Sequence, residues 1–172
     1  MFFLDQKALL LLFIFFFLSI FYSAPPFRFK SKPIIDSASN ILYALHGFIA
    51  YTTITHEYPS LLIIFIAWTW TSAMHLFSAI PDITYDKKAN ITTTTVWMEQ
   101  NNSLSLCTIL WSISALGLYG IHQVFLPMFI YPIISLYLLF EENQNISKIY
   151  WAFPYINSIL GCAYFWIILF HN

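Results

Sequence analysis

Six runs of nearly uninterrupted hydrophobic residues dominate the chain, and short polar segments separate them. A helix that crosses the hydrocarbon core of a bilayer needs about 20 mostly apolar residues, because it rises only ~1.5 Å per residue. Each run is close to that length, so the pattern predicts six membrane-spanning helices. The predicted spans cover residues 3–22, 39–55, 59–80, 104–122, 124–140 and 149–170.

The first of these runs has a second interpretation, a secretory signal peptide that ends near residue 23. Asp5 and a single Lys7 make a poor positively charged start for a signal peptide, and the apolar run is long for one. We therefore interpret this run as a membrane span.

The amino-acid composition agrees with the hydrophobic pattern. Hydrophobic residues make up 59% of the 172 residues, charged residues make up 9%, and the mean hydropathy is +0.71. A soluble domain carries about 25% charged residues, so this chain has too little charge to cover a water-facing surface. The net charge is −1 with seven Lys and Arg residues, which excludes a basic face for nucleic acid. The sequence therefore predicts an all-α, polytopic membrane helix bundle that forms a single domain over 1–172.

The basic residues lie almost entirely on one side of the predicted bundle. The loops 23–38, 81–103 and 141–148 fall on the same side and carry six of the seven Lys and Arg residues. Positive charge in short loops is retained on the cytoplasmic side of a membrane, so we expect these loops in the cytoplasm and both termini outside. A chain that begins outside, with no translocated domain before its first span, is typical of the latter part of a longer protein.

The closest grouping of charge is Asp82-Ile-Thr-Tyr-Asp86, which Lys87 and Lys88 follow directly. On a helix, this spacing places both carboxylates on one face, ~5–6 Å apart at Cβ. Two like charges at that separation repel each other, and a hard cation such as Mg²⁺ removes the penalty; Mg²⁺ is usually held by one or two carboxylates together with substrate phosphates. Lys87 would then lie against a phosphate. The same residues also fit a solvated loop that ends the preceding span, so the spacing alone leaves both interpretations open.

A second charged cluster precedes the first by two spans. The Pro25-Pro26 pair ends the first predicted helix at the membrane interface. Arg28 and Lys30 follow two residues apart on an extended segment, which continues to Asp36. These basic residues suit a positive-inside anchor, but an anchor does not explain why two charged clusters share one side.

His75 precedes Asp82 by seven residues, two helical turns back on nearly the same face. A histidine near a membrane interface is usually a hydrogen-bonded structural residue, and Mg²⁺ prefers oxygen ligands to imidazole. Cys107 and Cys162 both lie in apolar runs and form neither a disulfide framework nor a metal-binding spacing. The sequence also lacks nucleophile motifs, glycine-rich phosphate loops and zinc spacings, so it gives no support to hydrolase, ATPase or zinc-peptidase classes.

Two of these segments match the motifs of a known family. His75-Leu-Phe-Ser-Ala-Ile-Pro-Asp82-Ile-Thr-Tyr-Asp86 resembles the second aspartate-rich motif of the UbiA superfamily of intramembrane prenyltransferases. The wording around it, MHLFSAIPDI, is most similar to the lycopene elongase branch. Tyr22-Ser-Ala-Pro-Pro-Phe-Arg28-Phe-Lys30 resembles the family's preceding cytoplasmic motif. The two motifs occur in the family's order and on the same predicted side.

The resemblance implies a bundle of about nine helices around a cavity that opens to lipid. It implies that Asp82 and Asp86 bind Mg²⁺ and the diphosphate of an allylic donor, whose prenyl group moves to a lipophilic acceptor such as the carotenoid lycopene. The residues implied to contact the diphosphate are Arg28, Lys30, Lys87 and Tyr22, with Asp36 and His75 in supporting positions. Aromatic faces can shelter an allylic cation, and the candidates are Tyr43, Trp68, Trp70 and Phe77.

One departure from the family pattern is severe. The first family motif, Asn-x-x-x-Asp-x-x-x-Asp, does not occur in these 172 residues. The chain therefore resembles the latter two-thirds of a family member, and we expect it to be inactive unless a separate chain supplies the missing helices. Two alternatives stay open: a non-catalytic membrane subunit or degenerate remnant of such an enzyme, and a cation-coupled transporter. Transporter carboxylates usually lie near the bilayer midplane, which counts against the second.

Overall fold

The helices of the protein follow the apolar runs of its sequence. The computed structural model describes residues 5–141 and 145–170, and every regular element within those two ranges is helical, as predicted. In chain order the elements are α1 (Gln6–Ser23), η1 (Phe29–Ser31), α2 (Ile35–Ala38), η2 (Ser39–Ile41), α3 (Leu42–Thr55), α4 (Leu61–Ala79), η3 (Ile80–Asp82), α5 (Ile83–Lys88), α6 (Thr94–Ile121), η4 (Gln123–Phe129), α7 (Ile130–Phe140), α8 (Ile146–Tyr150) and α9 (Phe153–Phe170).

Five helical segments in the described ranges are long and apolar enough to cross a membrane, which confirms the predicted class of polytopic membrane protein. They are Gln6–Ser23, Leu61–Lys88, Thr94–Ile121, Gln123–Phe140 and Ile146–Phe170. The predicted span 39–55 is only partly right, because α3 has 14 residues and approaches span length only together with α2 and η2. Residues 3–4 of the first predicted span and 142–144 of the predicted loop 141–148 lie outside the described residues.

Helix α6 begins at Thr94 rather than at residue 104, where the sequence pattern placed its start. The hydroxyl of Thr93 accepts a hydrogen bond from the N–H of Val96 at 3.3 Å and so caps the helix. The first turns are polar, so hydropathy alone did not include them in the span. Glu99 interrupts the helix with φ 64° and ψ 172°, a conformation that non-glycine residues rarely adopt. Much of the predicted loop 81–103 is therefore helical.

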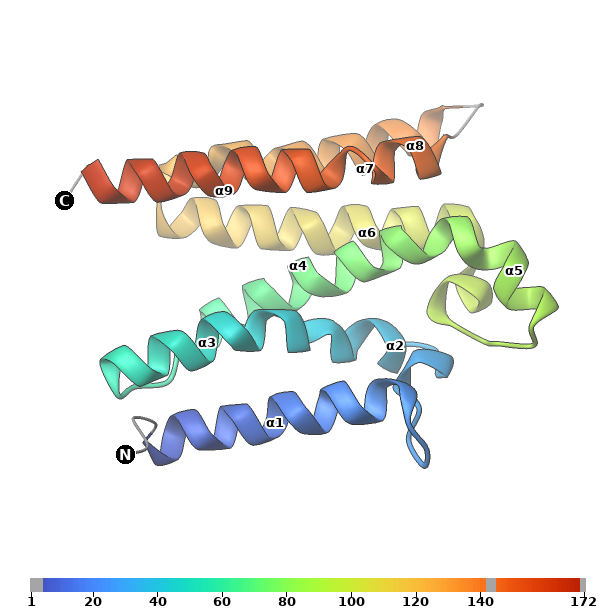
Figure 1. Cartoon of the computed structure of the whole chain (residues 1–172). Helices are drawn as coiled ribbons and strands as arrows, with labels where there is room; N and C mark the ends of the chain where they lie inside the picture. The colour runs from blue at the N-terminus through green and yellow to red at the C-terminus, as the bar shows by residue number, and fades with distance from the viewer. Residues whose placement is uncertain (1–4, 142–144, 171–172) are drawn as a thin grey trace.

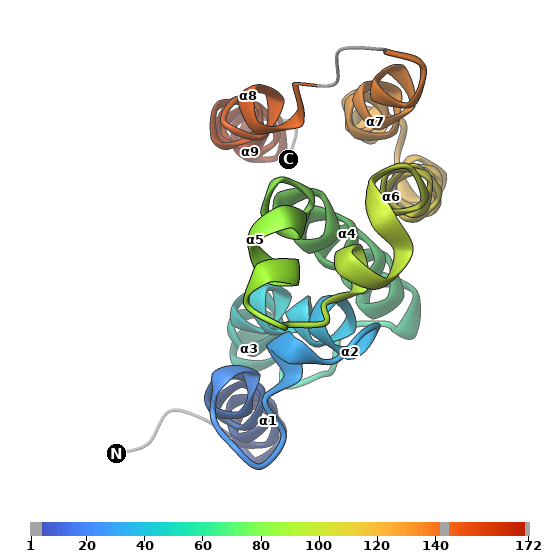
Figure 2. The ribbon, with the colours of Figure 1, turned by 90° about the vertical axis from the view of Figure 1, so that its right-hand side faces the viewer.

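The long helices run side by side along one axis (Figure 1). Helix α1 packs against α3, α4 packs against α6, and α6 packs against α7. Viewed along that axis, the helices form a curved row with α1 and α9 at its two ends (Figure 2). The segment after α1, the turn from α4 into α5, the start of α6, and α8 all lie at one end of the bundle (Figure 1). The charged segments thus share one end, which positions the site described below.

Four buried aromatic side chains from four helices form the centre of the core. Phe77 of α4 has its ring centroid 4.8 Å from that of Phe153 and 5.5 Å from that of Trp111. Trp111 of α6 lies 5.6 Å from Tyr131 of α7. Tilted and edge contacts of this kind stabilise aromatic clusters beyond the area they bury. The cluster joins the first turn of α9 to the rest of the bundle.

Charged side chains connect helices at the opposite end of the bundle. Lys7 of α1 pairs with Glu57 at 2.7 Å, and Asp5 pairs with His56 at 3.1 Å. The N–H of Ala8 and the imidazole of His56 hold the pKa of Asp5 below its usual value. These contacts link the start of α1 to the connection between α3 and α4.

Candidate functional site

Asp82 and Asp86 lie one helical turn apart where α4 ends. The short helix η3 begins at Ile80, includes Pro81 and ends at Asp82, and α5 continues directly through Asp86. Asp82 is exposed and Asp86 is partly buried, where its Oδ2 accepts a hydrogen bond from the hydroxyl of Thr93 at 3.4 Å. The carboxylates thus have the helical spacing that the sequence predicted. Neither forms an ion pair within residues 5–141 and 145–170.

A cavity of about 340 Å³ extends along α4 from the same helical face. His75 and Ser78 precede Asp82 by seven and four residues, so the three side chains share one face of the helix. His75 and Ser78 both line the cavity. The other lining residues are Asn40, Tyr43, Trp70, Thr71, Met74 and Tyr150. The cavity is therefore bounded by polar groups near the carboxylates and by aromatic and apolar groups elsewhere.

A second cavity of about 300 Å³ adjoins the first, because Tyr43, Trp70 and Thr71 line both. Its remaining lining is apolar apart from Ser114. These lining residues are Ala44, Ile63, Ile66, Ala67, Leu118 and Met128. Together the two adjoining cavities, which we call the passage, change from a lining that includes Asn40, His75 and Ser78 to one that is almost entirely apolar.

The aromatic candidates divide between the passage and the core. Tyr43 and Trp70 line both cavities. Phe77 is completely buried within the aromatic cluster of the core. Trp68 faces another direction, because its indole N–H donates to the carbonyl of Ala38 at 3.0 Å. Two of the four aromatic side chains are thus placed where they can contact a ligand in the passage.

The basic cluster that follows α1 reaches the same end of the bundle. Tyr22 lies near the end of α1, and its ring centroid is 6.2 Å from that of His75. Arg28 is exposed with a left-handed backbone (φ 43°, ψ 59°), and Lys30 is partly exposed in η1. No ion pair joins Arg28 or Lys30 to a carboxylate in the part of the chain that the structure describes. The structure thus brings Tyr22 to His75, and among the residues it describes neither Arg28 nor Lys30 has a carboxylate partner.

Asp36 lies at the junction of these segments and is completely buried. Its Oδ2 accepts a hydrogen bond from the N–H of Thr94 at 2.8 Å, and its Oδ1 accepts one from the Thr94 hydroxyl. Asp36 is also close enough to Tyr22, His75 and Asp86 to interact electrostatically with each. The carboxylate therefore faces the start of α6 rather than the solvent.

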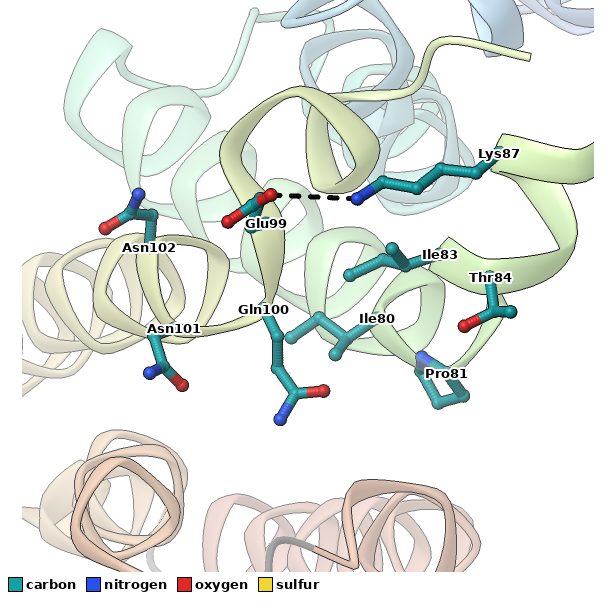
Figure 3. A pocket seen from close by; sticks show the side chains of 9 residues that line it. All are labelled: Ile80, Pro81, Ile83, Thr84, Lys87, Glu99, Gln100, Asn101 and Asn102. Atoms are coloured by element: carbon teal, nitrogen blue, oxygen red, sulfur yellow. Dashed lines mark ion pairs between the residues drawn. The ribbon is translucent and has the colours of Figure 1, made fainter. Parts of the chain in front are cut away.

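Lys87 is not paired with Asp82 or Asp86. Its ammonium group lies 3.7 Å from Oε1 of Glu99, across a hollow between α5 and α6 (Figure 3). The hollow measures about 460 Å³ and is lined by Ile80, Pro81, Ile83, Thr84, Lys87, Glu99, Gln100, Asn101 and Asn102. Both charged side chains are largely exposed, and an exposed ion pair contributes little stability. A contact between Lys87 and a bound anion therefore requires Lys87 to leave Glu99, at small cost.

Three parts of this end of the bundle were not singled out by the sequence analysis. The amide of Asn40 donates to the backbone carbonyl of Asp36, and their spacing of four was a visible signal. The run Thr93–Thr95 was given no role, although a threonine directly before a long helix is a capping signal. The pairing of Glu99 with Lys87 has no signal in the sequence, because it depends on how α5 turns back toward α6.

Membrane-capable helices, a passage along α4 and a carboxylate pair where that helix ends define an integral membrane protein with a charged site at one end of its bundle. The family model described as the UbiA prenyltransferase family matches residues 1–152. The lycopene elongase/hydratase of Haloferax volcanii is 37% identical over 147 residues, which cover 85% of this chain and 48% of that protein. The lycopene elongase/hydratase of Haloarcula japonica is 37% identical over 158 residues, covering 89% and 53%.

Solved structures agree in fold. A UbiA homolog from Archaeoglobus fulgidus bound to Cd²⁺ superposes with a TM-score of 0.66 at 22% identity, over 91% of this chain and 62% of that one. The homolog bound to GPP and Mg²⁺ has a TM-score of 0.61 at 24% identity, over 93% and 62%. The chain belongs to the UbiA prenyltransferase family, near its lycopene elongase branch. It spans about half the length of the curated relatives it matches.

Proposed function

We propose that the protein takes part in prenyl transfer within the membrane, from an allylic diphosphate to a lipophilic acceptor of the carotenoid class, such as lycopene. The observation that carries this proposal is the passage along α4, the helix that leads into η3 and α5 with Asp82 and Asp86. One of its two cavities has Asn40, His75 and Ser78 in its lining, and the lining of the other is almost entirely apolar. A donor with a charged head and an apolar tail needs both environments. Membership of the prenyltransferase family supports the reaction class, and the lycopene elongase/hydratase relatives support the acceptor.

Asp82 and Asp86 suit Mg²⁺ as the metal of this site. Carboxylate oxygens are the donors that Mg²⁺ prefers, and it usually takes one or two of them together with water and phosphate oxygens. No group of three or more His, Cys, Asp or Glu side chains capable of holding a metal occurs in the described ranges, so phosphate, water and the first family motif would complete the shell. When bound, Mg²⁺ would neutralise charge that develops on the departing diphosphate.

The chain's own residues would have two further tasks, which are to bind the diphosphate of the donor and to shelter its allylic group. Arg28 and Lys30 would contact the diphosphate with their positive charges, and Tyr22 would donate a hydrogen bond to it. Lys87 would leave Glu99 and pair with the diphosphate, which carries more negative charge. The faces of Tyr43 and Trp70 shelter the allylic cation that remains when the C–O bond breaks. The apolar wall beyond them excludes water, which would otherwise capture the cation before the acceptor double bond forms the new C–C bond. The positive charge then lies on the acceptor, which becomes neutral by losing a proton, either directly or after adding water.

We also propose that the charged end of the bundle faces the cytoplasm. The loops 23–38 and 81–103 carry five of the seven Lys and Arg residues, and both lie at the end of the bundle that holds the carboxylates (Figure 1). A membrane retains such loops on its cytoplasmic side. The diphosphate head group of the donor is water-soluble, so the donor would enter from the cytoplasmic side.

Cysteine labelling in intact cells tests this orientation. Ser31→Cys and Thr92→Cys are made in a Cys162→Ser background, since Cys162 is exposed whereas Cys107 is buried. An impermeant maleimide should label both positions only after the cells are permeabilised. Thr55→Cys, at the opposite end of the bundle, should be labelled in intact cells. The reverse pattern would contradict the proposed orientation.

Binding and turnover assays test the proposed reaction separately. Labelled geranyl diphosphate should bind the chain in lipid nanodiscs when Mg²⁺ is present and should dissociate when EDTA is added. The 172 residues alone should form no product from dimethylallyl diphosphate and lycopene, because the preorganised partners of the first motif are missing. Co-expression of a segment with Asn-x-x-x-Asp-x-x-x-Asp between two apolar spans should restore turnover. Absence of Mg²⁺-dependent binding would refute the donor site, and product from the chain alone would refute the need for the segment.

A further inference from the structure

The run Thr93–Thr95 at the start of α6 is buried although it follows an exposed turn. Thr93, Thr94 and Thr95 are only 7%, 2% and 0% exposed. A buried hydroxyl loses its water and needs a partner in the protein, and each of these hydroxyls finds one on a different element. The partners are Asp86 of α5 for Thr93, Asp36 of α2 for Thr94, and the backbone carbonyl of Ala79 at the end of α4 for Thr95. One short run therefore contacts all three segments around the proposed metal site.

The carboxylate of Asp36 in this network is completely buried and accepts hydrogen bonds from several protein donors. Besides Thr94, it accepts a hydrogen bond from the N–H of Ser37 at 2.8 Å, so both of its oxygens are occupied by protein donors. The N–H of Ile34 donates in turn to the Thr94 hydroxyl at 2.6 Å. Burying a carboxylate is costly unless donors satisfy it, and the N–H of Thr94 in the first turn of α6 is one of these donors. Asp36 thus fastens α2 to α6 and is not available as a metal ligand.

We propose that Asp36 is a positioning residue for the Asp82–Asp86 motif and acts through the Thr93–Thr95 run. The inference rests on the proposed function, because it assigns a task to that metal site. Asp36 fixes Thr94, and the adjoining Thr93 donates to Asp86 while its hydroxyl lies 3.1 Å from that of Thr95. Two carboxylates that repel each other would turn apart on an exposed helix. The buried network instead holds Asp86 in the orientation that a divalent cation shared with Asp82 requires.

Mn²⁺ binding, followed by electron paramagnetic resonance on the full chain in nanodiscs, tests the proposal without requiring turnover. Groups that orient a metal ligand typically contribute 10- to 100-fold in metal affinity. Asp36→Asn, Thr93→Val and Thr94→Val should each weaken Mn²⁺ binding about tenfold, and Thr93→Ser should keep the wild-type affinity. Thr94→Val keeps the negative charge of Asp36 but removes the hydrogen bond from the Thr94 hydroxyl. A loss of Mn²⁺ affinity in this variant therefore comes from the changed position of the network and not from the charge of Asp36. The matched control is Thr92→Val, because Thr92 is exposed and makes no side-chain hydrogen bond in the described ranges; its affinity should not change.

Amide hydrogen exchange of the same variants shows whether the network has opened. Exchange at Thr94 and Val96 should accelerate in Asp36→Asn and Thr94→Val and stay unchanged in Thr92→Val. Wild-type Mn²⁺ affinity in both Thr93→Val and Thr94→Val would overturn the inference, provided that Asp82→Asn abolishes binding. If Asp36→Asn does not fold, the two valine variants decide the question alone. Mn²⁺ binding that survives Asp82→Asn would instead refute the proposed metal site, and the inference with it.

Discussion

Replacing Asp82 or Asp86 with asparagine is expected to lower the kcat of the reconstituted prenyl transfer by at least about 100-fold, because transition-state charge then loses a preorganised partner. Asparagine keeps the size of the side chain but removes the negative charge that holds the cation. The diphosphate that leaves the donor would then carry its developing charge with less compensation. The measurement is product formation from dimethylallyl diphosphate and lycopene in membranes that contain the chain and the first-motif segment.

A carboxylate at the opposite end of the bundle provides the matched control. Glu57→Gln removes one negative charge from an exposed ion pair with Lys7, in the connection between α3 and α4, which lies at the opposite end of the bundle from α5 (Figure 1). Its kcat should stay within about twofold of wild type, since exposed pairs contribute little. If both aspartate variants retained more than a tenth of wild-type turnover, the pair would be a surface feature and the metal would have to bind elsewhere.

Trp111→Ala should produce the largest loss of stability of any single truncation in the core, about 3 kcal/mol in the free energy of unfolding. The side chain is 1% exposed and contacts rings from α4, α7 and α9. Lipid cannot fill the cavity left inside the aromatic cluster, so the dispersion contacts of the surrounding rings are lost. Unfolding of the detergent-solubilised protein in SDS, followed by circular dichroism, measures the effect.

Trp166→Ala is the control for this truncation. Trp166 lies on α9 and is 54% exposed, so in a membrane its removal exchanges one apolar contact for lipid. Its unfolding free energy should change by less than about 1 kcal/mol, as is usual for substitutions outside the core. Equal losses for the two tryptophans would mean that the aromatic cluster does not hold α9 to the bundle.

Several features of the site could be predicted because they depend on neighbours in the sequence. The spacing of His75, Asp82 and Asp86 places them on one helical face wherever the chain is helical, and the structure has that helix. The span 39–55 was predicted less well, since it consists of η2 and the 14-residue α3, and α2 precedes it directly. The start of α6 was also misplaced, because its first turns are polar and hydropathy reports only the lipid-buried part of a helix.

The sequence by itself determined the all-α membrane class, the carboxylate pair and the helix that carries it. The membrane class and the helix follow from runs long enough to cross the bilayer, with the backbone polar groups satisfied inside one helix. The carboxylate pair follows from a spacing of four residues in the sequence. Only the tertiary structure decided that Asp36 meets Thr94, 58 residues away, that Lys87 pairs with Glu99, and that Trp70 lines the passage whereas Phe77 enters the core. Such choices depend on which helix faces pack together, and the packing of side chains between helices is not specified by any spacing within one segment.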